Sequence, residues 1–256
     1  MKTILSFQDV QYNYHSMDGE TPALKDVNFE VYDGEFLSIV GPSGCGKTTL
    51  LSMIAGLLTP QSGTVSLCPE LSEHEHTIGY MLQHDHLFDW RTIYKNIMLG
   101  LEIQHDRTPE SRRKIDDLLQ KYGLYQFRNK YPSELSGGMR QRAALIRTLV
   151  LDPKLLLLDE PFSALDYQTR LSVSTDIVDI IKKEQKTAIL VTHDLSEAIS
   201  LSDRILVLTS RPGTVLKSLP IHLTKQGTGA VAARKSPEFS AYFNELWEDL
   251  HGNESA

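Results

Sequence analysis

Three short apolar runs recur along the chain between stretches of mixed polarity. They occupy residues 36–40, 155–158 and 188–191, and each ends at glycine or at polar and acidic residues. Continuous apolar runs of this length are typical of strands buried on both faces of a parallel sheet. The pattern therefore predicts an α/β fold whose ligand-binding residues lie where these strands end.

Helical spacing of apolar residues appears after the first run and again in the middle of the chain. The first predicted helix ends near Gly56 and has a buried face of Leu50, Met53, Ile54 and Leu57. The second starts at Thr108 and Pro109, which suit a cap and a first helical position, and ends at Gly123. Its buried face consists of Ile115, Leu118, Leu119 and Tyr122.

A last helix is predicted near the C-terminus, after a weakly patterned stretch at 225–235. Its apolar face consists of Phe239, Tyr242, Phe243, Leu246, Trp247 and Leu250. We expect this helix to pack against its own domain, and a regulatory or partner surface is the alternative.

The first apolar run leads directly into a glycine-rich loop. Its sequence matches G-x-x-x-x-G-K-[ST] at every fixed position, which is the Walker A pattern of nucleotide-binding loops. The residues predicted to bind nucleotide are Gly41, Pro42, Ser43, Gly44, Cys45, Gly46, Lys47, Thr48 and Thr49. Glycines allow the backbone N–H groups to surround a phosphate, and the following helix directs its positive end at the same anion. Lys47 adds positive charge, and the Thr48 hydroxyl is predicted to coordinate Mg²⁺.

The second apolar run ends in two acids, Asp159 and Glu160. Alone, this pattern also fits a buried strand followed by solvated acids. Beside a Walker A loop we interpret it as Walker B, in which Asp159 holds Mg²⁺ and Glu160 is the general base that polarises water. Because adjacent strand residues point to opposite faces, the two acids have different roles.

A second anion-binding pattern lies upstream of Walker B. Ser136, Gly137 and Gly138 precede a helical stretch that ends at Asp152-Pro153. A serine cap with glycines at a helix N-terminus binds anions. The run Leu135-Ser-Gly-Gly-Met139-Arg-Gln-Arg142 resembles the signature of ABC ATPases, usually LSGGQ, with methionine at position 139. This resemblance implies a head-to-tail homodimer, in which Ser136, Gly137 and Gly138 serve the ATP held by the other subunit.

Further motifs follow the order of the same family. By resemblance, Tyr14 stacks on adenine, although Tyr12 is an alternative, and Gln83 senses Mg²⁺ and water and links to the membrane partner. Asp166 closes a run, 163–166, that resembles the loop crossing the dimer interface. His193, at the end of the third apolar run, resembles the histidine that contacts the γ-phosphate. ATP and Mg²⁺ are the implied ligands, with Glu160, His193 and Gln83 as catalytic residues and Thr48, Gln83 and Asp159 at the metal.

Within ABC ATPases the chain is most similar to the ATP-binding subunits of nitrate/sulfonate/taurine-type importers. The methionine-containing signature, Leu87-Phe-Asp-Trp90-Arg-Thr92 and Ser210-Arg-Pro-Gly213 carry this resemblance. The run His84-Asp85-His86 departs from the acid-proline pair common in that family. An importer implies two transmembrane permease subunits, an extracytoplasmic substrate-binding protein and a location at the cytoplasmic face of the cell membrane. Nitrate, a sulfonate, taurine or a pyrimidine precursor are the expected cargo classes.

The resemblance also implies how the chain is organised. A P-loop core with a parallel-rich sheet and an N-terminal antiparallel β part is expected at about 1–83 and 151–220. A helical subdomain is expected at about 84–150, and a C-terminal extension at 221–256. An exporter subunit or a non-transport ABC ATPase is the alternative function. A P-loop kinase or GTPase does not explain the signature, and no N-K-x-D motif is present.

Composition narrows the partners. The 256 residues carry a formal net charge of −7 and contain no Lys/Arg-rich run, so nucleic acid is not expected to bind. The apolar runs are far shorter than the ~18 residues of a spanning helix, and no secretory pattern is visible, which predicts a cytosolic protein. Both cysteines are expected to be reduced. His74, His76, His84 and His86 are expected to be solvated loop residues, with a metal site as the alternative.

Overall fold

The computed structural model describes residues 2–17, 19–72, 77–224 and 229–251. A six-stranded sheet forms its centre, with the strand order β5-β6-β7-β3-β8-β9. These strands are Ile78–Met81 (β5), Leu155–Asp159 (β6), Thr187–Val191 (β7), Phe36–Val40 (β3), Arg204–Leu208 (β8) and Val215–Pro220 (β9). All neighbouring pairs are parallel except β8 and β9. The three apolar runs are therefore the neighbouring central strands β6, β7 and β3.

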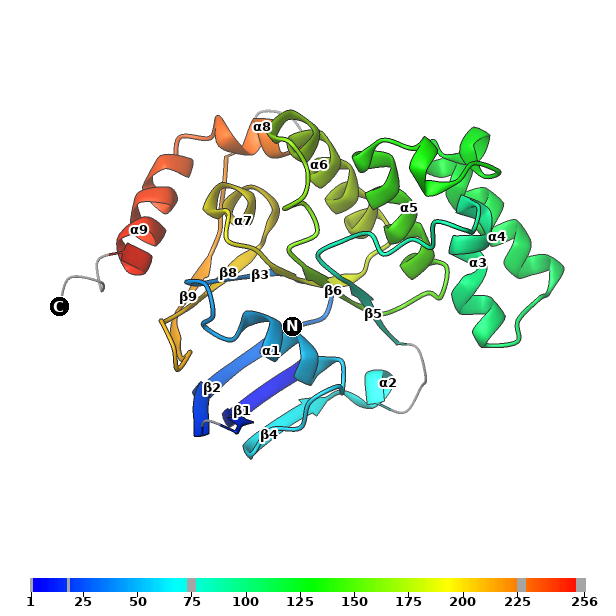
Figure 1. Ribbon diagram of the computed structural model, residues 1–256. Helices are drawn as coiled ribbons and strands as arrows, with labels where there is room; N and C mark the ends of the chain where they lie inside the picture. Colours follow the sequence, from blue (N-terminus) through cyan, green and yellow to red (C-terminus); the bar gives the residue numbers. More distant parts are fainter. Residues whose placement is uncertain (1, 18, 73–76, 225–228, 252–256) are drawn as a thin grey trace.

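An antiparallel sheet of order β2-β1-β4 forms a second layer. It consists of Thr3–Ser16 (β1), Gly19–Tyr32 (β2) and Ser62–Leu67 (β4). Helix α1, Lys47–Ile54, lies between the two sheets (Figure 1). Its apolar side chains join one hydrophobic cluster with β1, β2 and one face of the central sheet. The short helix α2, Pro69–Ser72, follows β4.

The other face of the central sheet is covered by Tyr167–Lys183 (α6) and Leu195–Leu201 (α7). Strand β6 contributes to both faces, because Leu155 and Leu157 join one cluster and Leu156 and Leu158 the other. Residues on such a strand are buried whichever way they point, which explains why its sequence is apolar without alternation.

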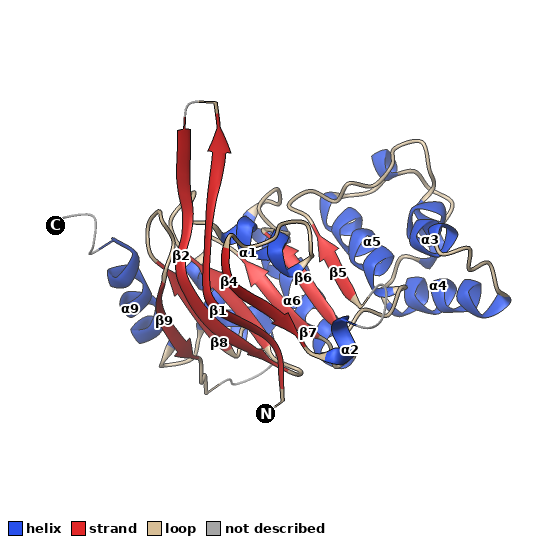
Figure 2. Ribbon diagram, turned by 90° about the horizontal axis from the view of Figure 1, so that it is seen from below, coloured by secondary structure: helices blue, strands red, loops and turns tan. Residues whose placement is uncertain are grey.

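Helices α3 (Ile93–Ile103), α4 (Pro109–Lys121) and α5 (Gly137–Leu149) lie together at one end of the molecule (Figures 1 and 2). Two 3₁₀ turns, Tyr125–Phe127 and Pro132–Glu134, connect α4 to α5. Thr108 caps α4, with its hydroxyl accepting a hydrogen bond from the Ser111 N–H at 3.2 Å, and Pro109 is the first helical residue. The α/β architecture predicted from the sequence, with an antiparallel sheet and an inserted group of helices, is confirmed.

Two expectations at the level of single elements are wrong. Helix α1 ends at Ile54 and Gly56 adopts a φ of +72°, so Leu57 is 68% exposed and does not belong to the buried face. The stretch read as weakly patterned contains a further helix, Gly229–Arg234 (α8). Its small apolar side chains Ala230, Ala232 and Ala233 are buried, and alanine spacing over six residues is too short to mark a helix in the sequence.

The C-terminal helix α9, Phe239–His251, packs against the cluster formed by β8 and α7. Leu246 is fully buried there, while Trp247 is 51% exposed. Trp90, on the loop that precedes α3, is 75% exposed. Within the described part of the chain, no helix has the length and apolarity needed to span a membrane.

Candidate functional site

The phosphate loop joins the end of β3 to α1. Gly46 has a φ of +100°, and a Cβ at this position would lie 2.5 Å from a methyl carbon of Leu24, so only glycine fits. The Lys47 ammonium donates to the backbone carbonyls of Gly41 at 2.8 Å and Pro42 at 2.9 Å. Cys45 is fully buried, and this burial raises the pKa of its thiol.

Asp159 stands at the end of β6 beside the first turn of α1. The Thr48 hydroxyl lies 3.4 Å from Asp159 Oδ1, and the Tyr80 hydroxyl lies 3.4 Å from Oδ2. Burial raises the pKa of Asp159 above its ordinary value, and the Glu160 carboxylate acts in the same direction. A hydroxyl and a carboxylate are the hard oxygen donors that Mg²⁺ prefers, and a bound cation would favour the ionised form of Asp159.

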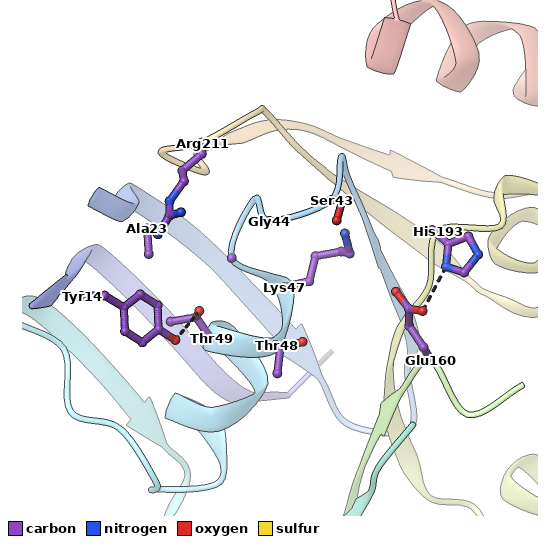
Figure 3. Close-up of a pocket in the computed structure, with 11 residues that line it drawn as sticks. Tyr14, Ala23, Ser43, Gly44, Lys47, Thr48, Thr49, Glu160, His193 and Arg211 are labelled. Carbon is purple, nitrogen blue, oxygen red and sulfur yellow. Dashed lines mark hydrogen bonds and ion pairs between the residues drawn. The ribbon is translucent and has the colours of Figure 1, made fainter. Parts of the chain in front are cut away.

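Glu160 and His193 face each other across the ends of β6 and β7. His193 Nδ1 lies 3.0 Å from Glu160 Oε2, as the dashed line in Figure 3 shows. Glu160 has a φ of +45°, an uncommon conformation for a residue other than glycine. The chain turns sharply at this point, with the Ser163 N–H donating to the Glu160 carbonyl at 3.2 Å.

The segment after His193 is held by a buried carboxyl and an arginine. The Thr192 hydroxyl donates to Glu197 at 2.7 Å, and Arg170 lies 3.7 Å from Asp194. Arg170 also donates to the carbonyls of Ser163 and Leu165. The turn that presents His193 is thereby connected to the loop after Glu160.

A pocket of about 480 Å³ opens above these strand ends. Its lining residues are Tyr14, Ala23, Ser43, Gly44, Gly46, Lys47, Thr48, Thr49, Glu160, His193 and Arg211. The Tyr14 hydroxyl lies 3.0 Å from the Thr49 hydroxyl, and Figure 3 shows Tyr14 on the opposite side of the phosphate loop from Glu160 and His193. Tyr12 instead packs against the core cluster between the sheets, so of the two tyrosines only Tyr14 lines the pocket.

Several residues predicted from the sequence lie outside this pocket. Gln83 is exposed just after β5. Ser136 is exposed and caps α5 by accepting from the Met139 N–H at 3.4 Å, while Gly137 and Gly138 form the first turn of that helix. Asp166 is exposed and caps α6 by accepting from the Thr169 N–H at 3.1 Å. None of these residues is among those that line the pocket.

Helix α5 is tied to the segment after Gln83. Arg140 forms an ion pair with Asp85 at 3.0 Å, and Arg147 donates to the carbonyls of Asp85 and His86. The rings of His84 and His86 are 5.9 Å apart, while His74 and His76 lie outside the described residues. Among the residues that the structure describes, no group of three or more His, Cys, Asp or Glu side chains is arranged to hold a metal ion.

Two lining residues, Ala23 and Arg211, were not singled out as site residues in the sequence. Ala23 belongs to β2, and Arg211 belongs to the turn between β8 and β9. In the sequence, the Ser-Arg-Pro-Gly run at 210–213 indicates only relatedness to the importer subunits. No sequence spacing connects this run to the phosphate loop. The two segments are far apart in the sequence and become neighbours only in the folded chain.

Comparison with known proteins identifies the family of this chain. Residues 24–163 match the ABC transporter family. The chain is 47% identical to the "Uncharacterized ABC transporter ATP-binding protein YtlC" of Bacillus subtilis, covering 98% of this chain and 97% of the relative. It is 39% identical to the nitrate import ATP-binding protein NrtD of Synechocystis sp., covering 98% and 96%.

Among solved structures, the chain resembles the dimeric post-hydrolysis state of the ATP-binding cassette MJ0796 bound to ADP and Pi. The TM-score is 0.71 at 31% identity, and the match covers 86% of this chain and 99% of the other. The family expected from the motifs is thus confirmed. The chain belongs to the ABC transporter family, as an ATP-binding and ATP-hydrolysing subunit.

Proposed function

We propose that this subunit drives an importer for a small anionic solute by closing as a head-to-tail homodimer around two ATP molecules. One observation carries the dimer: the pocket is separate from Ser136, Gly137 and Gly138. A capped helix N-terminus of this kind is an anion site. Since it does not line the pocket of its own chain, it is available to the triphosphate of a second subunit.

The predicted site residues have roles that follow from their chemistry. Lys47 and the loop N–H groups bind the β- and γ-phosphates, and Tyr14 stacks on adenine. Thr48, Asp159 and Gln83 would hold Mg²⁺, which would neutralise charge on the phosphate oxygens. Glu160 accepts a proton from the attacking water, and His193 orients Glu160 and the γ-phosphate. Asp166 contributes at the interface between subunits.

The transport assignment is supported by relatedness. NrtD, a nitrate import protein, shares 39% identity over nearly the whole length. We propose a complex of two copies of this chain, two transmembrane permease subunits and an extracytoplasmic substrate-binding protein. The chain would lie at the cytoplasmic face of the cell membrane. Gln83 and the exposed residues after it, including Trp90, would contact the permease. The cargo is nitrate, a sulfonate such as taurine, or a similar solute including a pyrimidine precursor.

The substitution Glu160→Gln tests the catalytic proposal. The amide keeps the shape of the side chain but cannot accept the proton, so turnover should fall by roughly 10²-fold or more while ATP affinity stays within a few-fold. In ATP and Mg²⁺ the variant should accumulate as a dimer on size-exclusion chromatography. Glu110→Gln, an exposed acid in the first turn of α4, is the matched control. Turnover near the wild-type rate in Glu160→Gln would refute the assignment.

Direction and cargo require an assay with the complete transporter. Disruption of this subunit should abolish uptake of one labelled solute from a panel of nitrate, taurine, alkanesulfonates and pyrimidine precursors. Loss of efflux with intact uptake would instead identify an exporter.

A further inference from the structure

The turn between β8 and β9 is fixed against the nucleotide pocket. The Gly213 N–H donates to the Ala23 carbonyl at 2.9 Å, and the Lys25 N–H donates to the Gly213 carbonyl at 3.0 Å. Thr209 and Thr214 close the turn through a backbone hydrogen bond of 3.0 Å. The turn therefore extends the edge of β2 and has one defined position.

The same turn touches the phosphate loop directly. A Cβ placed on Gly213 would lie 2.0 Å from the Cys45 carbonyl oxygen, a separation that no side chain tolerates. Gly213 is buried, so this contact is shielded from water. The backbone of residues 210–213 is thus packed between β2 and the loop that binds phosphate.

Arg211 extends from this turn into the pocket. Its Nε donates to the Pro22 carbonyl at 2.8 Å, which fixes the plane of the guanidinium. Within the described part of the chain, its two terminal nitrogens have no hydrogen-bond partner. Figure 3 shows the side chain beside Ala23, on the same side of the phosphate loop as Tyr14. Two basic side chains, Lys47 and Arg211, therefore line the pocket at different places along it.

We propose that Arg211 binds the ribose and α-phosphate part of ATP, through its two terminal nitrogens. The inference extends the proposed roles of Lys47, Tyr14 and Glu160. In the proposed roles, Glu160 and His193 lie at the γ-phosphate end of the ATP site and Tyr14 lies at its adenine end. Figure 3 shows them on opposite sides of the phosphate loop. A cation beside Ala23, on the same side of the phosphate loop as Tyr14, would meet the oxygen-rich segment that links base to triphosphate. A guanidinium held at Nε presents two parallel donors, which suits a phosphate oxygen or a pair of hydroxyls.

Ligands that share only part of ATP test this inference. We expect Arg211→Gln to raise the Kd for ATP and ADP about tenfold, which corresponds to the loss of one charge-assisted hydrogen bond. The Kd for inorganic pyrophosphate, which has only two phosphates and lacks ribose and base, should change less than about twofold. Arg211→Lys keeps the positive charge but lacks the planar guanidinium. Its Kd for ATP should therefore lie between those of the wild type and Arg211→Gln. Binding is measured by calorimetry on the full chain.

The control is Arg107→Gln, an exposed arginine remote from the pocket, which should bind all three ligands as the wild type does. An unchanged melting temperature of Arg211→Gln shows that the fold is intact. Equal loss of ATP and pyrophosphate binding, or no loss of either, would overturn the role of Arg211. Failure of the wild-type chain to bind ATP would instead overturn the proposed function together with this inference, so the two failures are distinguishable.

Discussion

Glu197 is a buried carboxyl group next to the turn that carries His193. Its side chain is 6% exposed, Oε2 accepts from Thr192, and Oε1 has no partner among the described residues. Burial raises the pKa of Glu197 from an ordinary value of 4.5 to about 7. The charge of Asp194 acts in the same direction, while the Thr192 hydrogen bond and the charges of Arg170 and His193 oppose it.

This pKa predicts how stability varies with pH. The folded state holds the proton of Glu197 more tightly than the unfolded state, so its contribution is complete below pH 4.5 and is lost as pH rises to about 7. Glu197→Gln, which cannot ionise, should therefore gain stability relative to wild type over this window, by up to roughly 3 kcal/mol. Urea unfolding at pH 5 and pH 8 measures this difference. The prediction is wrong if the gap between the two proteins is the same at both pH values, and Glu248→Gln on the surface provides the baseline.

At the scale of single residues, fixed-spacing motifs identified the part of the pocket that lies on consecutive residues. Six residues of the phosphate loop, 43–44 and 46–49, line it together with Glu160 and His193, whereas Gly41, Pro42, Cys45 and Asp159 are not among the lining residues. Arg211 could not be found this way, because its proximity depends on a turn meeting β2 and the loop. Nor could the sequence choose between Tyr12 and Tyr14. They differ only in which one faces the core, and β1 changes register beside β2 between residues 10 and 13.

Among the secondary-structure elements, the C-terminal helix α9 makes a clear prediction. Leu246 is fully buried against β8 and α7, whereas Trp247, the next residue, is 51% exposed and stacks on Phe243 with ring centroids 6.1 Å apart. Leu246→Ala should reduce the free energy of unfolding by about 2–5 kcal/mol because it leaves a cavity. Trp247→Ala should reduce it by less than about 1 kcal/mol.

Chemical denaturation of the two variants measures both values. A small cost for Leu246→Ala would mean that α9 contributes little to the fold and would favour a detachable, regulatory helix. The pattern of apolar residues could predict α9 itself but not which of its residues are buried, since Leu246 and Trp247 both belong to the broad apolar face.

Helices are predicted well where a long run of apolar residues at helical spacing is combined with residues that mark both helix ends. Helix α4 has both, with Thr108 and Pro109 at its start and Gly123 after its end. Helix α8 has neither, because it is short and rich in alanine. Helix α1 has an end signal at Gly56, but it ends at Ile54, one turn before the last apolar residue of its pattern. Leu57 fits the apolar spacing of α1 but follows Gly56, where the backbone leaves the helix. Apolar spacing alone does not show where the backbone turns.

For the molecule as a whole, the two anion sites proposed in each chain predict complementation between damaged subunits. In a head-to-tail dimer, each composite site combines Lys47 of one chain with Ser136 of the other, related by twofold symmetry. Lys47→Ala and Ser136→Arg should each be inactive alone. Their mixture should recover up to about one quarter of the wild-type rate, because half of the dimers are mixed and each has one intact site.

ATPase assays on the separate and mixed variants measure this recovery. Lys47→Ala mixed with Lys47→Ala is the control, since such a pair contains no intact loop. A mixture as inactive as its components would contradict the shared site and would favour use of Ser136 within its own chain.

The exposure of both tryptophans has a practical consequence for following this molecule by its intrinsic fluorescence. The chain contains two tryptophans, Trp90 and Trp247, which are 75% and 51% exposed. An indole in contact with water already emits at long wavelength, so unfolding should shift the emission maximum only slightly. Covering Trp90 should move that maximum to shorter wavelength. The native emission spectrum is therefore a poor reporter of denaturation and a sensitive reporter of whatever docks on the loop before α3.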